Sequence, residues 1–178
     1  DLLFRKVDYS VGKLLEDIAM GEIGLPDIQR PFVWDRARVR DLFDSMYRGY
    51  PIGTLLFWEN GYPGEHRVIG VGDKQKVPDL LIVDGQQRLT ALYAVMKGVP
   101  IIDQDFQERR LCIAFNPRKK RFEVTNTAIE RDFSWIADIS VLWQPGFDQY
   151  AFVSKFLERL SERRELLPDD PKRIPEAI

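Results

Sequence analysis

The residues best suited to chemistry lie in one short segment, Leu80–Thr90, which reads LLIVDGQQRLT. Its continuous apolar run predicts a buried strand that ends at Asp84, and Gly85 permits a sharp turn that a side chain would hinder. A helix is expected to begin directly after this turn. Its first backbone N–H groups then point back over the strand end, where these groups and the helix dipole favour an anion. The segment therefore predicts a phosphate site.

Three polar side chains follow the turn. Arg88 offers a bidentate fork for phosphate, whereas Gln86 or Gln87 can reach a phosphate oxygen, a base, an attacking water or the backbone. A structural interpretation competes with this one, because Asp84 can cap the helix and Gln87, three residues on, can complete a capping box. That interpretation leaves Arg88 unexplained, since a cation at a helix N-terminus costs about 0.3–1 kcal/mol unless an anion is present. The conflict favours the anion site.

A second informative segment, Leu25–Asp35, reads LPDIQRPFVWD. Its prolines favour extended backbone, since Pro31 disfavours a helical conformation at Arg30. Gln29 and Arg30 therefore lie on an extended stretch just before a helix that Asp35 is positioned to cap. Arg30 is either a second phosphate or partner contact or a paired surface charge.

The composition excludes several other chemistries. The chain has 178 residues, with one His, one Cys and a formal net charge of −2. A zinc site of His and Cys, an intrachain disulfide and a His–Asn–His nuclease all need more of these residues. A dedicated non-specific nucleic-acid binder would be more basic. No apolar run approaches the roughly 18 residues of a membrane span and no signal peptide opens the chain, so we expect a cytoplasmic protein. Because the chain begins with Asp, we also expect a piece of something longer.

Helices and strands must position these segments. Apolar residues at helical spacing predict helices after Ser10, after Asp35, before Gly98, and across 153–160 with an end near Pro168. Strands are predicted at 4–9, 53–58, 80–83, 111–115 and 122–124, with 53–58 and 80–83 buried on both faces. Together these elements predict a single α+β domain over residues 1–167, with residues 168–178 starting a linker or a truncated C-terminal region.

The last two predicted strands flank the sequence NPRKKR at 116–121, so we expect a hairpin with a basic tip. These cations, together with Arg109 and Arg110, either contact a DNA backbone or form a solvated turn.

In this order, PDIQRPFVW, GTLLFW and LLIVDGQQRLTAL resemble the N-terminal domain of GmrSD-type modification-dependent restriction proteins, which also occurs in the related phage-defence protein SspE. The motifs cover roughly residues 5–98. The resemblance implies a ParB/sulfiredoxin-like fold, in which a mixed sheet with flanking helices binds nucleotide phosphates at a strand–turn–helix junction.

The resemblance also implies an activity. It indicates a regulatory domain that binds and hydrolyses a nucleoside triphosphate (GTP, UTP, CTP or ATP) with Mg²⁺, coupled to DNA restriction. DNA is then engaged through the full-length protein, and cleavage belongs to a C-terminal nuclease domain or partner subunit outside this chain. The alternative is a non-catalytic module that binds nucleotide or DNA and acts as a switch.

Site residues follow from the same resemblance. The expected catalytic residues are Asp84, Gln86, Gln87 and Arg88. The expected nucleotide-binding residues are Gln29, Arg30, Gly85 and Arg88, and Trp34 completes the family's QR-x-aromatic-x-W segment. Asp84 is the expected ligand of the metal, since hard cations prefer oxygen ligands.

Overall fold

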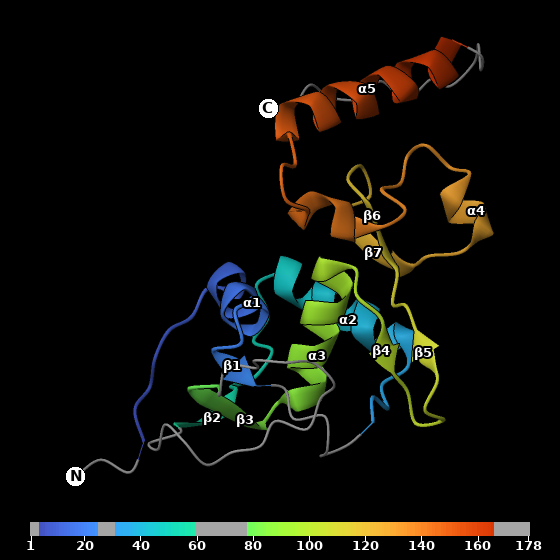
Figure 1. Cartoon of the computed structure of the whole chain (residues 1–178). Helices are drawn as coiled ribbons and strands as arrows, with labels where there is room; N and C mark the ends of the chain where they lie inside the picture. The colour runs from blue at the N-terminus through green and yellow to red at the C-terminus, as the bar shows by residue number, and fades with distance from the viewer. Residues whose placement is uncertain (1–3, 25–30, 60–77, 166–178) are drawn as a thin grey trace. The chain divides into compact units, whose positions relative to one another are not determined.

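The computed structural model of the chain describes residues 4–24, 31–59 and 78–165 (Figure 1). Helices and small sheets are mixed along the sequence, so the predicted α+β class is confirmed. The chain divides into two compact units, Asp1–Leu111 and Cys112–Ile178, and each is described by itself. Across the described ranges, none of the helices combines the length and the apolar character that crossing a membrane requires.

A three-stranded sheet organises the first unit. Its strands lie in the order β1 (Ile23–Gly24), β3 (Leu80–Asp84) and β2 (Leu56–Glu59). β1 runs parallel to β3 and β2 runs antiparallel to it, so the sheet is mixed, as the resemblance implies. Leu56 pairs with Asp84, and the register shifts directly after Leu56. The start of β2 therefore lies beside the end of β3 that carries the polar motif.

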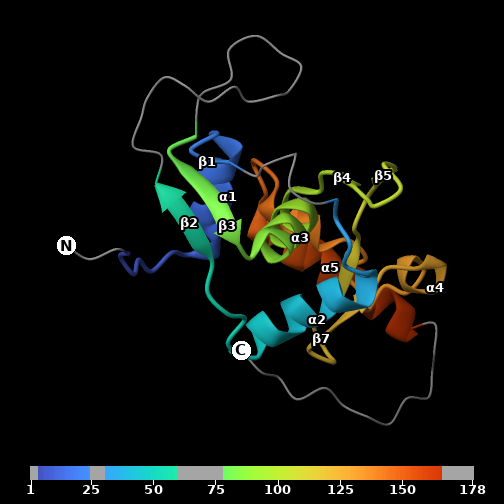
Figure 2. The ribbon, with the colours of Figure 1, turned by 90° about the horizontal axis from the view of Figure 1, so that it is seen from below.

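Two of the helices, α1 (Val11–Ala19) and α3 (Gln86–Lys97), lie on the same side of this sheet (Figures 1 and 2). One residue from each of α1, β1, β3 and α3 forms the buried cluster between them, namely Leu14, Ile23, Ile82 and Leu89. α3 is thus fixed at its first turn by Leu89, which is fully buried. This packing holds the strand–turn–helix junction in place.

The predicted helix boundaries are mostly confirmed. The Ser10 hydroxyl accepts a hydrogen bond from the Lys13 N–H (3.2 Å) at the start of α1. The Asp35 carboxylate accepts one from the Arg38 N–H (2.7 Å) at the start of α2 (Arg36–Tyr47). α3 ends at Gly98, whose φ of 67° is left-handed.

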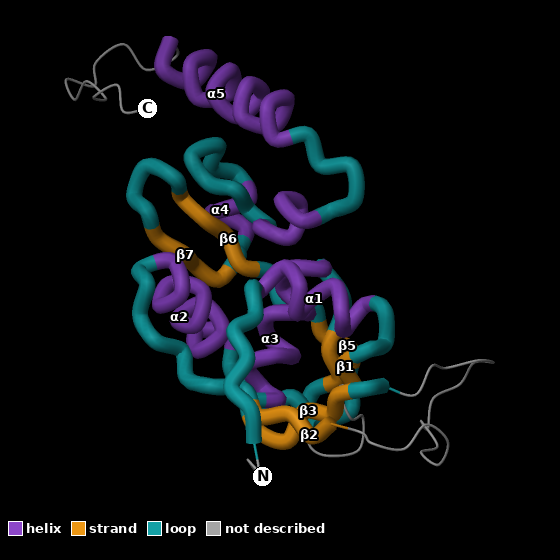
Figure 3. Tube along the Cα trace, turned by 90° about the vertical axis from the view of Figure 1, so that its left-hand side faces the viewer, coloured by secondary structure: helices purple, strands orange, loops and turns teal. Residues whose placement is uncertain are grey.

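The remaining elements are short, apart from the last helix. A two-stranded ribbon in the first unit pairs β4 (Ile101–Ile102) with β5 (Glu108–Arg109). The second unit contains β6 (Ile113–Asn116), β7 (Arg121–Val124), α4 (Thr127–Glu130), the 3-10 helix η1 (Ile139–Trp143) and α5 (Gln149–Glu165). The pair β6–β7 confirms the predicted hairpin (Figure 3).

Three strand predictions need correction. The strand at 80–83 forms, but it is not buried on both faces, since Val83 is 54% exposed and only Ile82 is buried. Residues 4–9 form no strand, and all six are exposed. The predicted strand 53–58 begins only at Leu56, and both Leu56 and Trp58 are exposed rather than buried. Among the described residues β2 pairs on one side only, with β3, and Phe57 is the apolar side chain of β2 that packs against the core cluster. The predicted domain boundary at residues 167–168 lies outside the described residues.

Candidate functional site

A pocket of about 460 Å³ opens where β3 meets α3. Its lining residues are Trp34, Val83, Asp84, Gly85, Gln86, Gln87 and Arg88. The motif Asp84–Arg88 therefore contributes all five of its residues, and the second predicted segment, Leu25–Asp35, contributes Trp34. Of the residues expected to bind nucleotide, Gln29 and Arg30 lie outside the described residues.

The turn between β3 and α3 requires glycine. Gly85 adopts φ +89°, a left-handed conformation that L side chains rarely take. A Cβ added there would collide with Leu55 Cδ2 and lie 3.1 Å from Arg88 Nη2. The expectation of a sharp turn at this position is confirmed, and the backbone at the pocket floor has little freedom to change.

The start of α3 is not capped by a side chain of the described residues. Gly85 occupies the N-cap position, and the first helical hydrogen bond runs from the Leu89 N–H to the Gly85 carbonyl (3.0 Å). The structural alternative, in which Asp84 and Gln87 form a capping box, is therefore wrong. The residues of this first turn line the pocket, and a helix N-terminus is a position that favours an anion.

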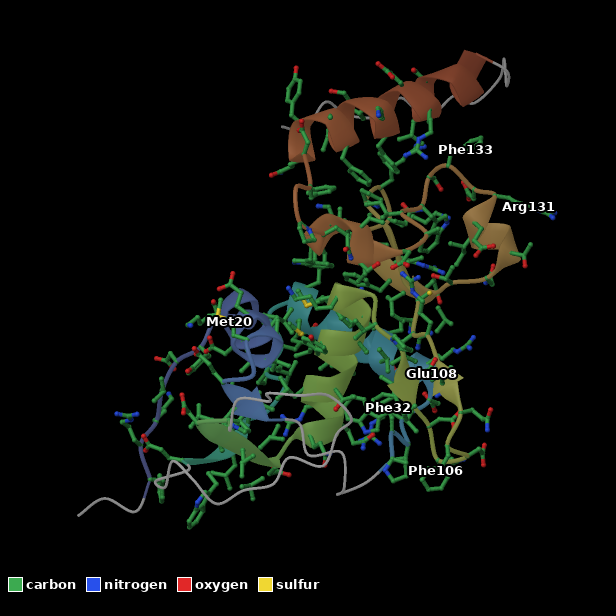
Figure 4. The ribbon with its side chains drawn as sticks, viewed as in Figure 1. Met20, Phe32, Phe106, Glu108, Arg131 and Phe133 are labelled. Atoms are coloured by element: carbon green, nitrogen blue, oxygen red, sulfur yellow. The ribbon has the colours of Figure 1, made fainter. Side chains whose placement is uncertain are left out.

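Gln87 joins the two predicted segments. Its Oε1 accepts a hydrogen bond from the Val33 N–H (3.0 Å), and its Nε2 donates to the Pro31 carbonyl (3.2 Å). Between these residues lies Phe32, which is labelled in Figure 4 and is buried. Its N–H donates to the Ile102 carbonyl of β4 (3.1 Å). Of the partners expected for Gln87, namely a phosphate oxygen, a base, a water or the backbone, the structure shows the backbone.

Arg88 holds the segment that precedes β2. Its Nη1 donates to the Ile52 carbonyl (2.5 Å) and its Nη2 donates to the Thr54 carbonyl (2.9 Å). Gly53 makes this approach possible, because a Cβ at that residue, which has φ +87°, would collide with Nη1. The side chain is 19% exposed. The two carbonyl partners therefore explain why Arg88 is stable at this helix start even without a bound anion.

Asp84 is the exposed charged residue of the site. Its side chain is 74% exposed, and its Oδ2 lies 3.8 Å from Arg88 Nη2. The described residues contain no group of three or more His, Cys, Asp or Glu side chains that could hold a metal ion. Mg²⁺ commonly binds through one or two carboxylates while it keeps waters and takes substrate phosphates. The donor set therefore fits a Mg²⁺ ion that arrives with phosphates.

Trp34 is the one lining residue of the pocket that comes from the segment before α2. The Arg38 guanidinium lies 4.5 Å from the centroid of the Trp34 ring, within cation–π range. Sequence reasoning missed Arg38, although its spacing of four residues from Trp34 is a usable signal. It also missed Gly53 and the two carbonyls that receive Arg88, because a backbone acceptor leaves no mark on residue type.

The fold and the site define an α+β domain with a polar pocket at a strand–turn–helix junction. Residues 11–174 match the family described as GmrSD restriction endonuclease, N-terminal domain, and the chain belongs to this family. The match runs through both compact units. An uncharacterized protein of Methanocaldococcus jannaschii is 38% identical over 82 residues, which cover 41% of this chain and 14% of that protein. This chain thus corresponds to a small part of that relative's length.

Proposed function

We propose that this chain is a nucleotide-binding and hydrolysing domain that regulates DNA restriction in phage defence. The observation that carries the proposal is the pocket of about 460 Å³, which is lined by the complete motif Asp84–Arg88 and by Trp34. Membership of the restriction endonuclease family supplies the DNA context. DNA cleavage itself is assigned to a nuclease domain or partner subunit.

The proposal places nucleotide phosphates at the first turn of α3. Three features support this placement: the Gly85 N-cap, a pocket lined by the first turn of α3, and the cationic residue Arg88 among the lining residues. Phosphoryl transfer needs positioning and charge neutralisation more than covalent chemistry from the protein. A polar pocket without histidine among its lining residues is compatible with that requirement.

Each residue of the motif has a distinct part in the proposal. Asp84 ligates the Mg²⁺ that accompanies the phosphates, and the ion supplies further neutralisation of phosphate charge. Arg88 uses two of its five N–H groups for the Ile52 and Thr54 carbonyls, and its remaining N–H groups bind the phosphates. Gln86 orients the attacking water. Gln87, which is bound to Pro31 and Val33, fixes the neighbouring segment and acts as a positioning residue.

A second candidate is a switch that binds nucleotide without hydrolysing it. The contacts of Gln87 and Arg88 favour this candidate, because both side chains tie the helix start to backbone elsewhere in the unit. A ligand that pulls on the first turn of α3 would then move the segments at 31–33 and 52–54. Nucleotide binding with no turnover would select the switch.

The test is Mg²⁺-dependent phosphate release from GTP, UTP, CTP and ATP by the whole chain. Asp84→Asn is expected to lower turnover by about 100-fold, the size of effect seen when one electrostatic contact to a transition state is lost. Asp79→Asn is the matched control, because Asp79 is also exposed and lies just before the other end of β3. Full turnover by the Asp84 variant would refute the assigned site.

A further inference from the structure

The basic tip of the β6–β7 hairpin is a second feature of interest, and it lies in the other compact unit. The residues of this tip are Arg118, Lys119, Lys120 and Arg121, all of them exposed. Arg109 and Arg110, which were expected to lie with these cations, belong to the first unit instead. The tip therefore belongs to a different unit from the pocket at Asp84–Arg88.

A buried side chain orders this turn. Asn116 is 1% exposed, its Oδ1 accepts a hydrogen bond from the Lys119 N–H (2.9 Å), and its Nδ2 donates to Ser134 Oγ (3.1 Å). Ser134 in turn donates through its N–H and its hydroxyl to Asp132 Oδ1 (3.0 and 2.9 Å). The turn is closed by Lys120, whose φ of 51° is left-handed. The buried Asn116 amide and the left-handed Lys120 thus fix the shape of this tip.

Below the turn, the two strands are also tied together. Asn116 pairs with Arg121 in the antiparallel ladder, and the rings of Phe115 and Phe122 lie 4.7 Å apart across the strands. An ordered turn on a paired ribbon keeps its side chains at fixed starting points. A partner then meets a preorganised surface and loses less entropy on binding.

The charges on this tip are largely uncompensated. Arg121 is partly neutralised, since its Nη2 lies 2.5 Å from Glu123 Oε1 and its guanidinium lies 5.8 Å from the Trp135 ring centroid. Within the described residues, no carboxylate pairs with Arg118, Lys119 or Lys120. Three adjacent cations repel each other, and this repulsion destabilises the turn that holds them together. A polyanion that lies against the turn neutralises the repulsion and stabilises the turn.

The composition of the tip indicates which polyanion fits. Between Asn116 and Arg121 no aromatic or aliphatic side chain apart from Pro117 is available. Protein interfaces are centred on apolar and aromatic anchors and are depleted in Lys, and membrane-surface segments add apolar residues to their cations. A contact made by Lys and Arg alone is typical of a phosphodiester backbone, which is bound without sequence preference.

We infer that the tip of the β6–β7 hairpin is a nucleic-acid backbone contact, made by Arg118, Lys119 and Lys120 on a turn that Asn116 preorganises. The near-neutral chain as a whole carries a net charge of −2, so the contact is local. It adds sequence-independent affinity and positions the second unit on DNA.

The experiment measures the affinity of the whole chain for a fluorescent 30-base-pair DNA duplex by anisotropy across a range of salt concentrations. The test variant is Lys119→Gln with Lys120→Asn, since Asn tolerates the left-handed backbone at residue 120. The control is Lys155→Gln with Arg159→Gln, which removes the same charge from exposed positions on α5 of the same unit. Circular dichroism verifies that both variants are folded.

The plot of log K against log salt has a negative slope, and each lost phosphate contact makes that slope shallower by about 0.9. The test variant loses two contacts, so its slope is expected to be shallower than that of the wild type by about 2. The control keeps the wild-type slope. Equal slopes for both double variants would overturn the inference, as would an absence of duplex binding by the wild type at low salt. Polyglutamate that binds the wild type as tightly as DNA would also overturn it, in favour of an acidic protein partner.

Discussion

The Gln87 side chain accepts a hydrogen bond from the Val33 N–H (3.0 Å), although the two residues are 54 positions apart in the sequence. This contact, with the bond from Gln87 to the Pro31 carbonyl, connects the motif at the start of α3 to the segment that leads to Trp34. Both Gln87 and Trp34 line the same pocket. One amide therefore sets the distance between the two parts of the candidate site.

Loss of this amide should loosen the segment. Gln87→Ala removes two exposed hydrogen bonds and is expected to lower the free energy of unfolding by about 1 kcal/mol in urea titrations. Hydrogen exchange at the Val33 amide should become faster at the same time. Gln104→Ala, at an exposed residue of the β4–β5 turn, is expected to change the stability by less than about 0.5 kcal/mol. Unchanged protection of Val33 in the Gln87 variant would contradict the assignment.

The turn at Gly85 should not accept a side chain. Gly85→Ala is expected to lower the free energy of unfolding by at least about 1–2 kcal/mol, since φ is +89° and the new Cβ meets Leu55. Gly12→Ala is the control, because Gly12 lies in α1 with open space around it and should gain about 0.5–1 kcal/mol. Thermal or chemical unfolding measures both. Similar effects of the two substitutions would argue against the described turn.

The guanidinium group of Arg88 is expected to stabilise the fold through its hydrogen-bond geometry as well as its charge. Arg88→Lys keeps the cation but loses the paired hydrogen bonds to Ile52 and Thr54, so we expect a loss of about 1.5–3 kcal/mol in the free energy of unfolding. Arg36→Lys, at an exposed residue of α2, should be neutral. If Arg88→Lys unfolds at the same urea concentration as the wild type, the fork does not hold the segment at 52–54.

Stability at high pH should depend on Lys13. Its ammonium donates to the buried Asp17 carboxylate (2.5 Å), and this bond raises the pKa of Lys13 above the ordinary value. A raised pKa means that the stabilisation is complete below the ordinary lysine pKa and is lost as the pH rises through the raised one. The urea midpoint of the wild type should therefore fall in that alkaline range, whereas Lys13→Gln should show a smaller fall. Parallel pH profiles would contradict the pairing.

Much of the fold follows from local rules that the sequence displays. Ser10 and Asp35 cap helices as their residue types indicate, Gly98 ends α3, and the hairpin at 113–124 forms around its predicted turn. The strand at 53–58 was less predictable, since an apolar run does not distinguish a central strand from an edge strand. The structure shows that β2 has one neighbour within the described part of the chain and that Trp58 is 67% exposed.

The candidate site divides in the same way. Its location at Asp84–Arg88 could be predicted, because an apolar strand, a glycine and a helix with polar first-turn residues are local features. The partners of Gln87 and Arg88 could not, since both side chains bind backbone carbonyl or amide groups of distant segments, and such groups are present at almost every residue. The choice between a capping box and an uncapped helix was decided by the position of Gly85 at the N-cap, where no side-chain cap bond forms.

The central claim is that nucleotide phosphates bind at the first turn of α3. The most direct measurement is a titration of ¹⁵N-labelled protein with a non-hydrolysable nucleoside triphosphate and Mg²⁺, followed by the chemical shifts of backbone amides. The largest changes are predicted at the amides of Gly85, Gln86, Gln87 and Arg88, with smaller changes at Val33, which Gln87 connects to them. Saturable shifts confined to other parts of the chain, or no shifts with any of the four nucleotides, would contradict the account.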